Sequence, residues 1–277
     1  VDNVVWGMNR AAGELADAVV TYTRDYGTHS PYLSAFLGRK LHIVPPPVTL
    51  DEATETDVGA FRQKHQLNGR KVIGIAARLA TEKGVEVLLN ALPAVLAEHP
   101  NALVLHAGPY ENIIGEEAYF ARLKPLFEKY AASYRLLGNL DGAELTAFYR
   151  NLDLLCICSL NSTESFGLVQ IEAMRNGVPV AACSLPGVRQ PVTMTGMGEV
   201  TDIGDHAALA AAINRILSDR EAYQRDPKLI SASNSPAQTA SEYVRLYQEL
   251  QAGKRDSSAA EPPAYEKLRQ MRDQWSS

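Results

Sequence analysis

Between Lys71 and about Ile203, short apolar runs alternate with longer segments of helical spacing. Strands that are apolar on both faces and separated by helices predict βαβ units and a parallel sheet. Right-handed crossovers between such strands give a doubly wound, Rossmann-like α/β domain. The expected strands are residues 71–77, 102–107, 134–137, 153–158, 179–182 and 199–201. The expected helices are residues 85–98, 116–130, 142–150 and 167–176.

The segment before this core is too short to form a domain by itself. It predicts a helix, a strand at 18–23, a helix at 29–37 and a short strand at 41–44. Three prolines, 45–47, then stiffen the chain as a hinge between domains would. Because the chain opens with Val1 inside a helical pattern, we expect a fragment. Residues 1–44 are then the remnant of an N-terminal domain, and residues 45–235 form the sheet domain.

The last part of the chain predicts two further segments. Ser235 and Pro236 open a helical pattern that runs through Gln251, so residues 236–252 are expected to be a crossover helix. From Gly253 the composition turns polar, and residues 253–277 predict a mobile tail. The alternative is a small docking helix, because Leu268, Met271 and Trp275 have helical spacing.

Composition excludes several function classes. The net charge of −5 argues against binding nucleic acid through bulk charge. No apolar run approaches the length of a membrane span, and we expect a cytoplasmic protein. Cys156, Cys158 and Cys183 lie in apolar runs, which favours buried thiols over a disulfide framework or a metal site. No metal or cofactor is therefore predicted.

In an open parallel sheet, ligands bind beyond the carboxyl ends of the strands. After the first strand come Arg78 and then Lys83, which precedes Gly84 and a helix. Two cations beside a helix N-terminus suit a diphosphate. The alternative is two solvated surface cations with Glu82 as their partner.

Other strand ends give weaker signals. Gly108 would let backbone pass close to a ligand, but an ordinary turn is equally consistent. Arg189 follows the fifth strand and could bind phosphate, contact the missing domain or be a solvated surface charge. His106 is expected to be a satisfied core histidine.

The end of the fourth strand gives the most specific signal. Between Thr163 and Gly167 the chain turns from strand to helix, where free N–H groups favour phosphate. Glu164 precedes the helix and Glu172 lies within it, and carboxylates suit the vicinal hydroxyls of a ribose or a hexose. Glu172 stands among apolar residues, so it requires a partner.

These residues carry a family resemblance. Ala77-Arg78-Leu79, Glu82-Lys83-Gly84, the Glu164-x7-Glu172 pair and Gly177-Val-Pro-Val180 are similar to the donor-binding C-terminal domain of glycosyltransferase family 4 (group 1), which has the GT-B fold. The resemblance runs from about Ala18 to Tyr247. It departs from the family in lacking most of the N-terminal acceptor domain, and Pro186-Gly187 stands where many members have two glycines.

The resemblance implies a role for each residue. Arg78 and Lys83 would neutralise the donor diphosphate, Glu172 would bind the ribose, and Glu164 would hold the donor sugar. The backbone of Phe166, Gly167 and Leu168 would meet the sugar and phosphates, with Gly108 nearby. Transfer of a hexose would retain the anomeric configuration and need no catalytic metal.

The partners implied are a nucleotide diphosphate sugar and an acceptor that is a sugar, a lipid or a small molecule. Peripheral membrane contact would run through the missing N-terminal half, and the fragment alone would be inactive. Two other functions stay open: a non-catalytic nucleotide-binding module and a nucleotide-sugar 2-epimerase. The nucleotide base is not predicted.

Overall fold

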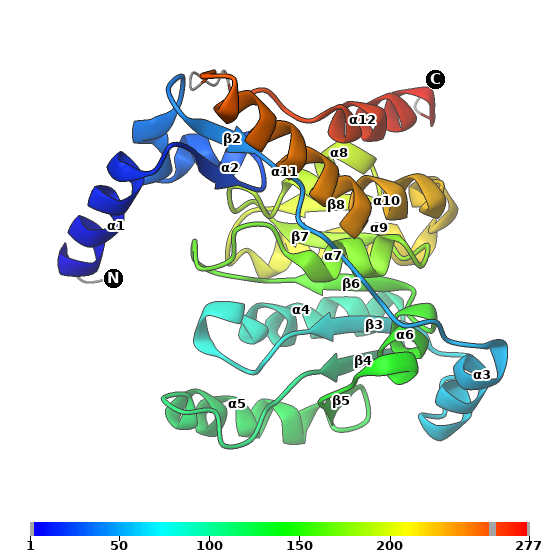
Figure 1. Ribbon diagram of the computed structural model, residues 1–277. Coiled ribbons are helices and arrows are strands. Elements are labelled where there is room, and N and C mark those ends of the chain that lie inside the picture. The colour runs from blue at the N-terminus through cyan, green and yellow to red at the C-terminus, as the bar shows by residue number, and fades with distance from the viewer. Residues whose placement is uncertain (1–2, 255–258, 276–277) are drawn as a thin grey trace.

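A computed structural model describes residues 3–254 and 259–275. Within this part of the chain, two short strands pair in parallel near the N-terminus and six parallel strands form the main sheet (Figure 1). The strands are β1 (Val19–Thr21), β2 (Leu41–Ile43), β3 (Lys71–Ala76), β4 (Ala102–Ala107), β5 (Tyr134–Gly138), β6 (Leu154–Ile157), β7 (Val180–Cys183) and β8 (Gly198–Thr201).

The strand order in the main sheet is β5-β4-β3-β6-β7-β8. The chain starts at the centre with β3, runs outward to β5, and then crosses back to β6 on the other side of β3. The topological switch point therefore lies between β3 and β6, which is where such sheets bind ligands. The predicted doubly wound α/β domain is confirmed.

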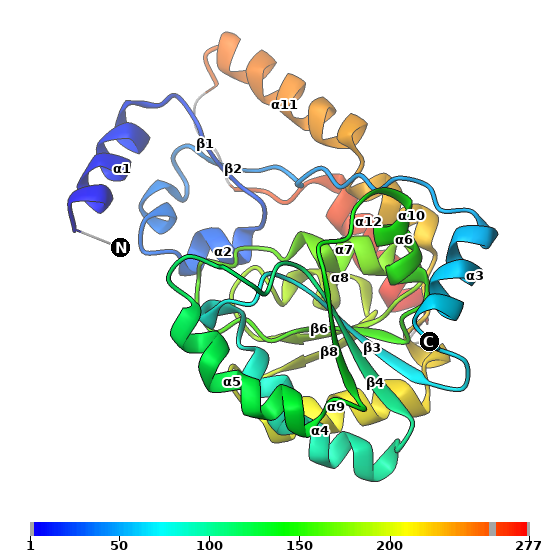
Figure 2. The ribbon, with the colours of Figure 1, turned by 90° about the horizontal axis from the view of Figure 1, so that it is seen from below.

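Helices cover both faces of the main sheet, as Figure 2 shows. Along β3, Ile73 and Ile75 pack on one side and Val72 packs on the other, so the strand is apolar on both faces as predicted. The helices on the first side are α4 (Val85–Glu98), α5 (Glu117–Lys129) and α9 (His206–Ser218). Those on the second side include α3 (Glu55–Lys64), α6 (Gly142–Arg150), α7 (Leu168–Met174), α8 (Gln190–Thr195) and α10 (Pro227–Ser233).

The expected helix at 29–37 is wrong. The structure has α1 (Asn3–Leu15), then α2 (Arg24–His29) and a separate 3-10 turn, η1 (Leu33–Phe36). The side chain of Thr23 caps α2 by accepting from the N–H of Tyr26 at 3.1 Å. The helix ends at Ser30, whose backbone is extended, because a residue before proline avoids the helical region.

The proline segment is tied to the start of the predicted crossover helix, α11 (Pro236–Gln251). Thr239 of α11 donates its hydroxyl to the carbonyl of Pro45 at 2.9 Å, and the N–H of Val48 donates to the carbonyl of Asn234 at 2.8 Å. These two hydrogen bonds hold residues 45–48 beside residues 234–239. The division of the chain at residue 44 stays a prediction.

The prediction of a mobile tail is wrong for the last described residues, which form the helix α12 (Pro263–Trp275). Tyr265 and Leu268 are fully buried, and the Tyr265 hydroxyl donates to the carbonyl of Tyr22 at 2.9 Å. The docking helix, the alternative expectation, is what the structure shows. Residues 255–258 and 276–277 of that expected tail lie outside the described residues.

Candidate functional site

A cavity of about 200 Å³ opens at the switch point of the main sheet. Its walls are the carboxyl ends of β3 and β6 and the turn that leads into α7. Lys83, Glu164, Gly167 and Leu168, four of the predicted site residues, line it together. The remaining predicted residues, Arg78, Gly108, Phe166 and Glu172, lie outside this lining.

Lys83 reaches the cavity because its turn is pressed against the end of β6. Gly84 follows in the left-handed region at φ 60°, and a Cβ built on it would stand 2.2 Å from the carbonyl oxygen of Cys158. Only glycine allows this approach. The N–H of Leu160 donates to the carbonyl of Glu82 at 2.8 Å and fixes the same contact.

Glu164 belongs to the segment 161–167, here called the donor turn. The side chain of Asn161 organises it by accepting from the N–H and hydroxyl of Thr163, at 3.1 and 2.7 Å. Gly167 ends it at φ 75° and begins α7. Glu164 Oε2 lies 2.6 Å from Lys83 Nζ, and both side chains are partly buried. A cation and a carboxylate are thus held together at the cavity wall.

Arg78 and Gly108 flank this wall from the β3 and β4 ends. Arg78 is half-exposed and forms an ion pair with Glu82, the partner named in the surface alternative. Gly108 has φ 134°, and a Cβ on it would stand 2.1 Å from the carbonyl oxygen of Ala77. Its glycine is therefore needed for packing between the two strand ends. Convergence of Arg78 and Lys83 on one anion stays a prediction.

Glu172 has the partner that its apolar surroundings require. The hydroxyl of Tyr149 on α6 donates to Glu172 Oε2 at 2.5 Å. Burial raises the pKa of Glu172 above its usual range, although the bond from Tyr149 and the charge of Arg175 lower it in part. Because Glu172 is four residues after Leu168, it lies on the same face of α7 as that cavity-lining residue.

Phe166 can meet a ligand only through its backbone, because its side chain is fully buried. Its carbonyl accepts from Gln170 Nε2 at 2.9 Å, and the same nitrogen donates to the carbonyl of Val188 at 2.8 Å. Gln170 is not among the residues predicted from the sequence. The signal in the sequence is an amide that stands between Val169 and Ile171 in an apolar run, and in the structure this amide is fully buried.

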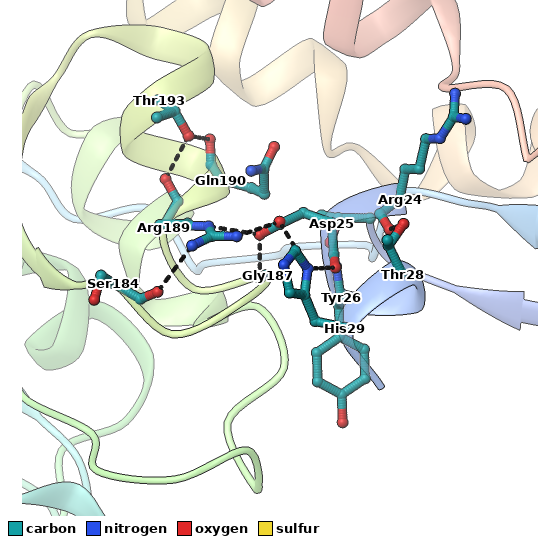
Figure 3. Close-up of polar contacts among 11 residues, drawn as sticks. Arg24, Asp25, Tyr26, Thr28, His29, Ser184, Gly187, Arg189, Gln190 and Thr193 are labelled. Atoms are coloured by element: carbon teal, nitrogen blue, oxygen red, sulfur yellow. Dashed lines mark hydrogen bonds and ion pairs between the residues drawn. The ribbon is translucent and has the colours of Figure 1, made fainter. Parts of the chain in front are cut away.

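Arg189 is engaged with the N-terminal segment. It donates to Asp25 of α2 through Nε at 2.9 Å and Nη2 at 2.6 Å, as Figure 3 shows. This contact with a segment that is present in the chain is none of the three alternatives expected for Arg189, which were phosphate, the missing domain and solvent. Asp25 itself was not anticipated.

His106 is the satisfied core histidine that was expected. Its ring nitrogens contact the Tyr134 hydroxyl and the Ala77 carbonyl, each at 2.8 Å, and burial lowers the pKa of His106 to about 4. The cysteines 156, 158 and 183 are free and buried. Across the described ranges 3–254 and 259–275, no cluster of three or more histidine, cysteine or acidic side chains could hold a metal ion. Nor does any described helix have the length and apolarity to cross a membrane.

Two kinds of solved structures share this architecture. A TM-score of 0.72 relates the chain to an Anabaena protein, HepE, crystallised in complex with UDP, at 23% identity over 87% of this chain and 65% of that one. The same score relates it to sucrose-phosphate synthase from Thermosynechococcus elongatus, at 24% identity over 91% of this chain and 63% of that one. The class that the fold defines is thus one half of a GT-B protein.

The family follows from the sequence match. The model described as "Glycosyl transferases group 1" matches residues 57–228, and the chain belongs to that family. A relative from Corynebacterium jeikeium, named D-inositol 3-phosphate glycosyltransferase, is 33% identical over 65% of this chain and 44% of its own length. A Mycolicibacterium smegmatis relative, named GDP-mannose-dependent alpha-(1-6)-phosphatidylinositol monomannoside mannosyltransferase, is 29% identical over 76% of this chain and 55% of its own. The chain therefore spans about half the length of such relatives.

Proposed function

We propose that this chain is the donor-binding half of a retaining hexosyltransferase that uses a nucleoside diphosphate sugar. The observation that carries the proposal is the cavity at the switch point, which holds Lys83, Glu164, Gly167 and Leu168 together. A cation, a carboxylate and backbone N–H groups at the start of a helix are the groups that phosphates and sugar hydroxyls require.

In the proposed complex, the phosphates replace Glu164 as the partner of Lys83. Glu164 then turns to hydroxyls of the donor sugar, and N–H groups of Gly167 and Leu168 contact phosphate or sugar oxygens. Arg78 exchanges its exposed pairing with Glu82 for the diphosphate. Cations held beside the diphosphate stabilise the negative charge that grows as the sugar leaves.

Glu172 binds the ribose in this proposal. It lies one turn along α7 from the cavity, and its carboxylate accepts a hydrogen bond from the phenol of Tyr149. A partly buried carboxylate can accept further hydrogen bonds, which the vicinal hydroxyls of a ribose would donate.

We infer that the acceptor binds to a half of the protein that corresponds to the part of the relatives that this chain does not span. The names of two relatives point to polyols: inositol 3-phosphate in one case and a phosphatidylinositol glycolipid in the other. We therefore propose a polyol or its lipid as the acceptor, with any membrane contact made through that other half. We also propose that transfer needs no catalytic metal, which activity after treatment with a chelator would test.

Calorimetric titration of the chain with UDP and with GDP tests the donor site. We expect one of them to bind and Lys83→Ala to weaken that binding about 10- to 100-fold, since a charged contact contributes roughly 1.5–3 kcal/mol. Lys64→Ala is the matched control, because Lys64 also pairs with a glutamate, Glu144, at 2.7 Å but lies on α3. Equal binding by the wild type and Lys83→Ala would reject the proposal.

A further inference from the structure

A short N-terminal segment touches the donor turn at several points. This segment, residues 22–26, is called the brace here. The hydroxyl of Tyr26 donates to the carbonyl of Ser162 at 3.2 Å. The ring of Tyr22 meets the ring of Phe166 edge to face, with centroids 6.0 Å apart. Both ends of the donor turn are thus in contact with a part of the chain more than 130 residues earlier.

Asp25 is the centre of the brace, as Figure 3 shows. Its Oδ2 accepts from the N–H of Gly187 at 2.8 Å and from Arg189 Nε at 2.9 Å, and its Oδ1 accepts from Arg189 Nη2 at 2.6 Å. The Asp25 side chain is only 13% exposed. Two-pronged pairing between a guanidinium and a carboxylate fixes orientation as well as distance.

The residues that Asp25 holds lie directly against the donor turn. Gly187 has φ 81°, and a Cβ on it would stand 2.0 Å from the carbonyl oxygen of Ser165. Gln170 joins the same two segments by donating to the carbonyls of Phe166 and Val188. Movement of the loop at 187–189 would therefore displace the backbone directly after Glu164, at Ser165 and Phe166.

We propose that Asp25 and Arg189 are positioning residues for the donor sugar. They fix the loop at 187–189, which in turn fixes the donor turn and the carboxylate of Glu164. The proposal rests on the proposed function, since it assigns Glu164 to the sugar. A turn held in place before binding loses less conformational freedom when the ligand arrives, and this raises affinity.

The test compares binding of a nucleotide and its sugar by calorimetry. The probes are UDP with UDP-glucose and GDP with GDP-mannose, and the pair that the wild type prefers is used. Asp25→Asn keeps the shape and removes the charge, while Arg189→Lys keeps the charge and removes the fork. We expect each to weaken nucleotide-sugar binding about 3- to 10-fold and to weaken binding of the bare nucleotide less.

A double variant tests whether the two residues act through one contact, and a control variant tests whether the effect is specific to that contact. The double variant Asp25→Asn with Arg189→Lys should bind the nucleotide sugar no more weakly than the more affected single variant. Each substitution disrupts the same ion pair, so their effects should not add. Arg39→Gln breaks another two-pronged pair of the N-terminal segment, with Glu14 at 3.0 and 3.3 Å, and should leave both affinities unchanged. Thermal unfolding of each variant identifies a loss of binding that merely follows a loss of folding.

Three results overturn the inference. The first is nucleotide-sugar affinity unchanged in folded Asp25→Asn and Arg189→Lys. The second is an equal loss for the sugar-bearing and the bare nucleotide, which would make the pair a general support of the fold. The third is a wild type that binds none of the four probes, which rejects the proposed function as well.

Discussion

At the scale of single residues, Glu172 combines burial with a charge. Its raised pKa means that ionisation is harder in the folded chain than in the unfolded one. Stability is therefore lower at neutral pH than it would be with a neutral side chain, and this cost is relieved as the pH falls through the raised pKa. A residue kept at a cost to the ligand-free fold is typical of a binding site.

Replacing Glu172 with glutamine should change stability and binding in opposite directions. Glu172→Gln keeps an oxygen for the Tyr149 hydroxyl but has no charge to bury, so we expect a melting temperature at pH 7 that is unchanged or up to about 3 °C higher. Nucleotide binding should weaken by about 1–3 kcal/mol. At acid pH the melting temperatures should converge. Unchanged nucleotide affinity would contradict the ribose assignment.

Replacing Glu164 should separate the nucleotide from its sugar. The carboxylate lies 2.6 Å from Lys83 and, in the proposed complex, competes with phosphate for it. Glu164→Gln should therefore bind a bare nucleoside diphosphate as tightly as the wild type or up to about tenfold more tightly. Its preference for the nucleotide sugar over the bare nucleotide should fall. Calorimetry with both ligands checks this, and a preference that survives in full would remove Glu164 from the sugar site.

At the scale of elements, glycine conformation brings Lys83 to the cavity. Gly84 and Gly69 both have left-handed backbone, at φ 60° and 71°. A Cβ added to Gly84 would clash with a backbone carbonyl oxygen, whereas a Cβ added to Gly69 would meet no atom within 4 Å. Gly69→Ala should cost about 1 kcal/mol of unfolding free energy, and Gly84→Ala about 3 kcal/mol or more. Urea unfolding measures both. Equal losses would mean that the turn can move away from Cys158.

Much of the element pattern could be predicted from sequence, because strands apolar on both faces and short Gly-containing exits are local signals. Two missed helices also carried local signals. Thr54 and Asp57 form a capping box at the start of α3, and Asp205 caps α9. The expected helix at 29–37 is wrong because Pro31 keeps Ser30 extended, which ends α2.

Some contacts of the candidate site could likewise be predicted from the sequence, and others could not. Lys83 and Glu164 both follow the carboxyl ends of parallel strands. Their position at the same edge of the sheet could therefore be predicted. The pairings of Asp25 with Arg189 and of Tyr149 with Glu172 join different elements through tertiary packing. No spacing rule in a single sequence encodes them. The docking of α12 likewise depends on a buried surface that other elements supply.

At the scale of the whole molecule, donor binding and sugar transfer should separate. The predicted donor residues lie on the main sheet domain, whereas transfer also requires an acceptor held against the anomeric carbon. We expect this chain to bind nucleotide yet transfer no sugar, and a chain extended by an N-terminal half to transfer with retention. Product analysis with labelled donor distinguishes transfer, epimerisation and binding alone. Equal transfer by the two chains would show that the active site is misplaced.

The site itself is tested most directly by a crystal structure of the chain with the nucleoside diphosphate that it binds. Our expectation is a diphosphate beside Lys83 and the start of α7, with the ribose hydroxyls within hydrogen-bond distance of the Glu172 carboxylate. A diphosphate bound elsewhere would contradict it, for example in the separate hollow lined by Tyr110 and Phe120.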